Sequence, residues 1–131
     1  MIHAKLAKDP YRVDITAGGH ALVSDEGPDH AGHNAGPPPF DLVLAGLASC
    51  TLITLRMYAE RKGWATVDLG GEFFHRVEDG RHLIDRRLRV SGVPEEGLER
   101  LRDIVERTPV TQALKDGFAI STNMQSVAEV R

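Results

Sequence analysis

The chain of 131 residues has a single cysteine, few aromatic residues and no excess of positive charge. One cysteine excludes an internal disulfide and fits a reducing compartment. Aromatic residues make up 5% of the sequence, too few for the base-stacking surfaces of proteins that bind single strands. The net charge of −3 also lacks the basic excess that a duplex-binding surface requires. We therefore expect no nucleic-acid partner.

Long hydrophobic runs and targeting signals are missing as well. The uncharged apolar run at 42–55 has 14 residues, short of the ~20 that cross a bilayer. The first ten residues carry charges within their apolar stretch, unlike a signal peptide. Neither a G-x-S-x-G elbow nor a glycine-rich dinucleotide fingerprint is present. We expect one domain over residues 1–131, in the cytoplasm, with no membrane partner, no bound cofactor and no metal.

The order of predicted elements indicates an α+β fold. Short strands are predicted at 2–6, 11–15 and 20–23, because turn residues separate these alternating segments. A long helix follows from Pro39 to Lys62, with prolines before it and Gly63 as its C-terminal stop. The remaining predicted elements are strands at 67–78 and 81–91 around an Asp79-Gly80 turn, helices starting near Pro94 and at Thr108-Pro109, and a final strand from Phe118 to Val130.

The long predicted helix is apolar on nearly all sides in its middle, which is typical of a helix enclosed by other elements. Small residues recur at a spacing of four, Ala45 with Ser49 and Gly46 with Cys50. Such pairs let another backbone come close, so a second helix is expected to cross this one tightly. A domain of this size rarely surrounds such a helix unaided. A second copy of the chain is therefore expected to cover it.

Cys50 has two interpretations, an inert core residue or a reactive thiol with charged partners from elsewhere in the fold. Asp41 of the same helix cannot reach it, because nine residues place it about 13–14 Å away along the axis. An activating charge must come from another segment or another protomer. The candidates by residue type are Arg12, Arg86 and the histidines of the 30–33 loop.

Arg86 is unusual because it shares a strand face with Ile84, Leu88 and Val90. Either this part of the strand lies near solvent, or the guanidinium is buried near a site.

Two histidine pairs are candidates for ligands. His30 and His33 form at most half of a metal site, since only the loop carboxylates Asp25, Glu26 and Asp29 are near in sequence. Solvated loop histidines are the interpretation that we adopt. His75 and His82 are expected to face each other across the hairpin as ordinary strand residues.

Two stretches carry a family resemblance, residues 36–51 (GPPPFDLVLAGLASCT) and residues 54–64 (TLRMYAERKGW). They resemble the OsmC/Ohr family of osmotically inducible and organic-hydroperoxide-resistance proteins, in particular its OsmC-like branch. The order of predicted elements matches that family over nearly the whole chain. The resemblance implies an intertwined homodimer in which antiparallel sheets embrace two long central helices.

The resemblance also implies thiol chemistry in oxidative and osmotic stress defence. Cys50 as a thiolate would attack the O–O bond of a small organic hydroperoxide, which gives an alcohol and a sulfenic acid on Cys50. An arginine would hold the thiolate charged, and Arg12 is the candidate. The family's helper glutamate falls at Phe40 in this chain, and the acidic residue Asp41 lies next to it. The second cysteine of the family's peroxidases is replaced by Thr108. An external thiol must therefore resolve the sulfenic acid.

Two other functions remain open. A branch without peroxidase turnover would bind an apolar ligand at the dimer interface, or would sense oxidants. A thioesterase with a hotdog-type fold would instead rely on a helix carboxylate such as Asp41 and would not need Cys50.

Overall fold

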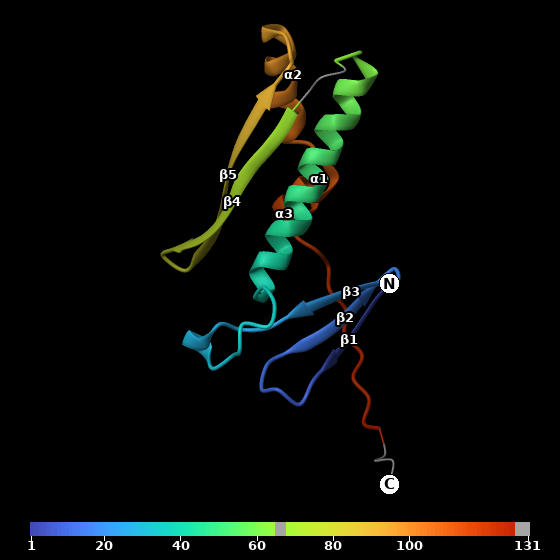
Figure 1. Ribbon diagram of the computed structural model, residues 1–131, viewed down its shortest axis with the longest axis vertical. Coiled ribbons are helices and arrows are strands. Elements are labelled where there is room, and N and C mark those ends of the chain that lie inside the picture. Colours follow the sequence, from blue (N-terminus) through green and yellow to red (C-terminus); the bar gives the residue numbers. More distant parts are fainter. Residues whose placement is uncertain (65–67, 128–131) are drawn as a thin grey trace.

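The computed structural model describes residues 1–64 and 68–127 (Figure 1). Its elements are β1 (Ile2–Leu6), β2 (Val13–Ala17), β3 (His20–Ser24), a 3-10 turn η1 (Pro28–His30), α1 (Pro39–Arg61), β4 (Asp68–Glu78), β5 (Arg81–Ser91), α2 (Glu95–Val105) and α3 (Pro109–Asp116). The predicted α+β class is confirmed. The strand start predicted at Val67 lies outside the described residues.

The strands form two antiparallel sheets, one of β1, β2 and β3 and one of β4 and β5. The β4–β5 hairpin pairs all 11 residues of each strand, from Asp68 opposite Ser91 to Glu78 opposite Arg81. Its turn residues Asp79 and Gly80 have φ values of 51° and 76°. Positive φ at both positions is the geometry of the predicted two-residue turn.

The helix α1 begins after prolines and ends before Gly63, whose φ of 76° suits a helix terminator. Along its length it buries Leu47, Thr51, Leu55 and Ala59, which recur every four residues and form one face. This face packs against β4, α2 and α3, as Figure 1 shows. The buried core centres on Leu55, Leu101 and Val105. Within one protomer, α1 is therefore enclosed on one side and not all round as the sequence suggested.

Among the described residues, α1 also has the length and composition of a helix that could cross a bilayer. The core helix of a soluble protein passes the same test. The packing of α1 on β4, α2 and α3 is that of a core helix.

The N-terminal sheet lies beyond the first turns of α1, away from the hairpin and the other helices (Figure 1). Every residue of β1 is exposed, including Ile2 and Leu6 at 61% each. A small sheet needs an apolar cover to be stable. Within the described part of one protomer this sheet has little of that cover.

The final strand predicted from Phe118 to Val130 is not observed over 118–127, and residues 128–130 lie outside the described part. The described segment is extended and exposed, with Phe118, Ile120 and Met124 at 66%, 85% and 91%. A strand needs a paired edge for its N–H and C=O groups. The alternating pattern is present, but the described part of the protomer gives it no partner strand.

The loop between β3 and α1 is organised by Asp25, which is buried. Its carboxylate accepts hydrogen bonds from the backbone N–H groups of Glu26, His33 and Ala35, at 2.8, 3.2 and 3.1 Å. Over the described ranges 1–64 and 68–127, no group of three His, Cys, Asp or Glu side chains is arranged to hold a metal ion. Asp25 therefore binds the backbone of its own loop.

Replacing Asp25 by asparagine tests this role through pH. The hydrogen bonds, that of Ala35 foremost, lower the pKa of Asp25 below its ordinary value. A lowered pKa stabilises the fold above the unfolded value of about 3.9, and that contribution is lost as pH falls through the folded value. Asp25→Asn should thus lower the urea midpoint at pH 7, and its difference from wild type should shrink below about pH 4. A difference that is constant with pH would contradict this, and the exposed Asp29→Asn serves as the control.

Candidate functional site

Cys50 lies in the middle of α1 and is partly exposed. Its Sγ atom lies 3.9 Å from the Thr54 hydroxyl, one turn further along the helix. Residues that are alternately three and four positions apart lie in one row along a helix. Cys50 lies in such a row with Val43, Gly46, Ile53 and Met57, and we call these five residues the apolar stripe. Val43, Ile53 and Met57 are 41%, 59% and 51% exposed. The thiol thus belongs to the side of α1 that one protomer leaves open.

No contact within the protomer explains why the apolar stripe has a glycine at position 46. A Cβ atom built there meets no atom within 4 Å. By contrast, a Cβ atom at Gly97 would lie 2.7 Å from the Trp64 ring. Glycine inside a helix costs about 1 kcal/mol relative to alanine. No contact in the described protomer requires glycine at this position.

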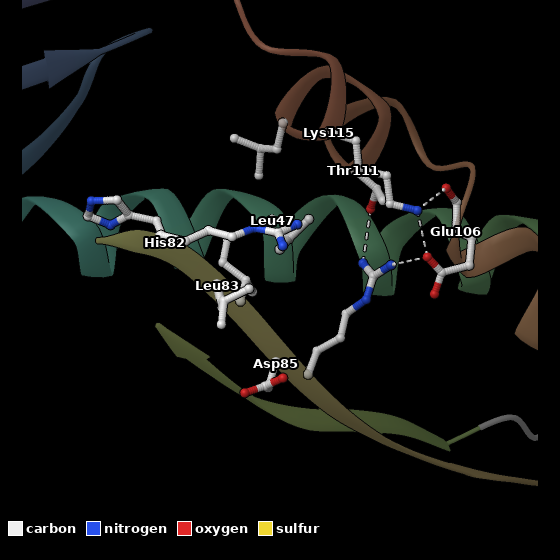
Figure 2. A pocket seen from close by; sticks show the side chains of 11 residues that line it. Leu47, His82, Leu83, Asp85, Glu106, Thr111 and Lys115 are labelled. Carbon is white, nitrogen blue, oxygen red and sulfur yellow. Dashed lines mark hydrogen bonds and ion pairs between the residues drawn. The ribbon is translucent and has the colours of Figure 1, made fainter. Parts of the chain in front are cut away.

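A second group of polar residues surrounds Arg86, whose side chain is only 13% exposed. Its NH1 group donates to the hydroxyls of Thr51 and Thr111 at 3.1 and 2.9 Å. Its NH2 group donates to the Val105 carbonyl at 2.9 Å. Figure 2 draws the bond to Thr111. Arg86 is therefore partly buried and hydrogen-bonded on the packed side of β5, and does not lie at a solvent-exposed strand end.

Thr108 joins this group from the start of α3. It is fully buried and occupies the N-cap position, but its hydroxyl contacts the Thr111 hydroxyl at 2.6 Å and caps no backbone N–H. We call Arg86, Thr51, Thr108 and Thr111 the Arg86 cluster. The sequence indicated Arg86 by its charge on an apolar face. It gave no comparable signal for Thr51 and Thr111, since threonine is common on helices and their shared partner is distant in sequence.

The Arg86 cluster fixes the turn of α1 that carries Cys50. The Thr51 hydroxyl, which accepts from Arg86, also donates to the Leu47 carbonyl at 2.7 Å. Cys50 precedes Thr51 and is turned by about 100° from it around the helix. The guanidinium therefore holds the backbone of this turn while Cys50 faces a different side.

A cavity of about 580 Å³ lies beside the cluster, between β5, α1 and α3 (Figure 2). Leu47 and Leu114 give it apolar walls, and Arg86 and Lys115 give it positive charge. Glu106 lies 2.7 Å from the Lys115 ammonium and 3.7 Å from the Arg86 guanidinium. The bond from Lys115, with the charge of Arg86, lowers the pKa of Glu106.

The other predicted site residues lie elsewhere in the protomer. Arg12, directly before β2, pairs with Asp14 at 3.0 Å, and the two side chains are 37% and 53% exposed. Asp41 is exposed in the first turn of α1. In the described part of the chain, neither residue is among the contacts of Cys50. A charge brought to the thiol by Arg12 would have to come from another protomer.

Phe40, at the position of the family's helper glutamate, makes an aromatic contact. Its ring stacks on His75 and His82, with centroids 4.1 and 5.3 Å away. Nε2 of His75 lies 2.8 Å from Nδ1 of His82, so the two rings share a hydrogen bond across the hairpin. The two histidines meet across the hairpin as expected, but diagonally, because the register pairs His75 with Ile84 and His82 with Val77.

Known structures share this fold. A protein from Psychrobacter arcticus, described as an osmotic stress induced and detoxification response protein, aligns over 86% of this chain and 85% of its own, with 15% identity and a TM-score of 0.71. An organic hydroperoxide resistance protein OsmC from Legionella pneumophila aligns over 88% of both chains, with 18% identity and a TM-score of 0.63. An OsmC-like protein from Mycoplasma pneumoniae aligns over 88% of this chain and 86% of its own, with 20% identity and a TM-score of 0.59.

The sequence itself places the chain in a family. No curated protein sequence matches it. The model of the family described as OsmC-like protein matches residues 32–123, which include α1, Cys50, the β4–β5 hairpin and the Arg86 cluster. Since this match extends over more than half of the chain, the protein belongs to the OsmC-like family.

Proposed function

We propose that this protein is a cytoplasmic, dimeric hydroperoxide reductase of oxidative and osmotic stress defence, with Cys50 as its reactive thiol. The chain belongs to the OsmC-like family, and α1 packs on β4, α2 and α3. The observation that carries the proposal is the position of Cys50. The chain's lone thiol lies partly exposed on the open side of the central helix, within the motif that resembles the family's peroxide-reacting segment.

The proposed reaction uses one cysteine and an external reductant. The Cys50 thiolate attacks one oxygen of the O–O bond, the bond breaks, and the other oxygen leaves as an alcohol after taking a proton. Cys50 is oxidised to a sulfenic acid. An external thiol then condenses with it, releasing water and forming a mixed disulfide. A second external thiol releases Cys50 and carries away the disulfide. Thr108 has no sulfur with which to do this internally.

Stabilising the thiolate requires a hydrogen-bond donor or a cation. The Thr54 hydroxyl, 3.9 Å from Sγ, is the donor on the same helix. Arg86 is committed to the Arg86 cluster. We assign the cationic role to Arg12 of a second protomer.

The dimer is supported by three unpartnered surfaces of the protomer: the apolar stripe, the N-terminal sheet and the extended segment 118–127. A second protomer can cover all three at once, if the two stripes cross and the sheet edges pair between protomers. Such an arrangement would enclose α1 on both sides, as its composition suggests.

Replacing Cys50 by serine is the direct test. Wild-type protein mixed with cumene hydroperoxide in a stopped-flow instrument should lose its thiol at least about tenfold faster than free cysteine does, which corresponds to ~1.4 kcal/mol of transition-state stabilisation. Cys50→Ser should show no thiol-dependent turnover. Thr54→Val should slow the oxidation without abolishing it, while Ser49→Ala, one residue from Cys50, serves as the matched control. Oxidation no faster than that of free cysteine would contradict the proposal.

The cavity beside the Arg86 cluster favours a second function, ligand binding without peroxidase turnover. Its volume of about 580 Å³ falls in the range of small-molecule sites. Native mass spectrometry of protein purified without added ligand should then show the mass of a retained small molecule, and Cys50 would act as an oxidant sensor. The thioesterase alternative gains no support, because Asp41 is not among the residues that line this cavity.

A further inference from the structure

Two histidines lie near the turn of the β4–β5 hairpin, on the face of the hairpin that packs toward α1. Strand alternation places His82 on the same face as Ile84 and Arg86, whose guanidinium reaches Thr51 of α1. His75 lies opposite Ile84 and therefore on that face too. In the described part of the chain, the only hydrogen bond of each histidine ring is the one between the two rings. Two metal-ligating side chains thus face each other on a largely apolar surface.

The distance between the two ring nitrogens is close to that of two ligands of one metal ion. Nε2 of His75 lies 2.8 Å from Nδ1 of His82. Two imidazoles that bind one tetrahedral zinc ion at about 2.0–2.1 Å each hold their nitrogens about 3.3 Å apart. The two rings reach this spacing if they separate by roughly half an ångström and turn their nitrogens toward a common point.

Phe40, at the start of α1, restricts the orientation of both histidine rings. Its ring centroid is 4.1 Å from that of His75 and 5.3 Å from that of His82, and its plane is inclined to theirs by 10° and 18°. The phenyl ring therefore covers one side of the pair and orients it, as the groups behind metal ligands do in other proteins. His82 is exposed and His75 is partly exposed, so an ion from solvent has access to the pair.

We propose that His75 and His82 form a surface site for a divalent transition-metal ion of the zinc type. Neutral imidazole is a preferred ligand of zinc, copper and nickel ions. The ion takes the place of the shared proton, which moves to the other nitrogen of its own ring, and it links β4 to β5. Within residues 1–64 and 68–127 no third His, Cys, Asp or Glu side chain joins the pair, so water completes the coordination.

This site is independent of Cys50 and of the proposed reaction. The sequence alone predicts no metal, because the two histidines are seven positions apart and only the hairpin register brings their rings together.

A zinc titration followed by NMR of the histidine rings tests the site directly. In metal-free wild-type protein, the ring signals of His75 and His82 should shift together and saturate before those of the other four of the six histidines. His75→Gln and His82→Gln should each weaken zinc binding here by about tenfold or more, since the second imidazole of a chelating pair acts at a high effective concentration. His20→Gln removes an exposed histidine from β3 and serves as the matched control, with unchanged affinity.

Urea unfolding gives a second readout, because an ion that binds the folded hairpin stabilises it. Zinc should raise the urea midpoint of wild type and of His20→Gln more than that of His82→Gln, whereas magnesium, which prefers oxygen ligands, should not. The midpoints without metal show whether each variant is folded. The proposal would be overturned if the ring signals of His75 and His82 shifted no earlier than those of the other histidines, or if both glutamine variants bound zinc as tightly as wild type.

Discussion

Replacing Arg86 by methionine should lower the free energy of unfolding by about 3 kcal/mol, a large part of the 5–15 kcal/mol typical of a domain. Methionine fills much of the space of the arginine stem but donates no hydrogen bond. The Val105 carbonyl would lose the guanidinium, and the buried Thr51 and Thr111 hydroxyls would lose a charged donor. Leaving buried acceptors without partners costs more than the bonds contribute on average.

The measurement is a urea titration at fixed protomer concentration, since a dimer's stability depends on it. Arg87→Met is the matched control, because Arg87 lies on the opposite face of β5, is exposed, and places its guanidinium over the Phe74 ring, 5.3 Å from the ring centroid. It should change stability by less than about 1 kcal/mol. Arg86→Lys should fall between the two, since one ammonium cannot reach acceptors on α1, α2 and α3 together. Equal midpoints for Arg86→Met and Arg87→Met would show that the Arg86 cluster contributes little.

Arg86 also shows which features of the site can be predicted from the sequence and which cannot. Strand periodicity places the arginine on the apolar face of β5, which is correct and marks it as unusual. The periodicity cannot say what lies opposite. That depends on where α1 and α3 pack, which brings Thr51 and Thr111 to the guanidinium from 35 and 25 residues away. Local patterns predict the element and the face, whereas the partners follow from tertiary packing.

For the segment after α3, the strand that the sequence predicts is not observed over residues 118–127. The alternation of Phe118, Ile120 and Thr122 predicts a strand, yet residues 118–127 are extended without strand pairing. Alternation along the sequence indicates that one face of the segment is buried. A strand also requires the edge of another strand, with which its backbone N–H and C=O groups can pair. The proposed dimer supplies that edge from the second protomer. The same reasoning applies to α1, whose composition predicts burial on all sides and whose apolar stripe is open in one protomer.

Replacing Gly46 by leucine should convert the proposed dimer to a monomer. Within one protomer the substitution is harmless, because a Cβ atom at Gly46 meets nothing within 4 Å and leucine is the better helix former by about 0.8 kcal/mol. If two stripes cross at Gly46 and Cys50, the leucine side chain would occupy the space of the second helix. Overpacking of this kind costs about 1–3 kcal/mol at each site, and the dimer contains two such sites.

Light scattering during gel filtration measures this directly. Wild type should have twice the protomer mass of 14.4 kDa, and Gly46→Leu should approach the protomer mass at the same concentration. Gly27→Leu is the matched control, since Gly27 has an ordinary extended conformation and equally open space around its Cβ position, but lies outside α1. It should remain dimeric. Because the proposed Arg12 belongs to the second protomer, monomeric Gly46→Leu should also react more slowly with hydroperoxide although Cys50 is intact. A Gly46→Leu variant that stays dimeric would show that the two stripes do not cross at Gly46. A monomer that reacts at the wild-type rate would show that the partner of Cys50 lies within its own chain.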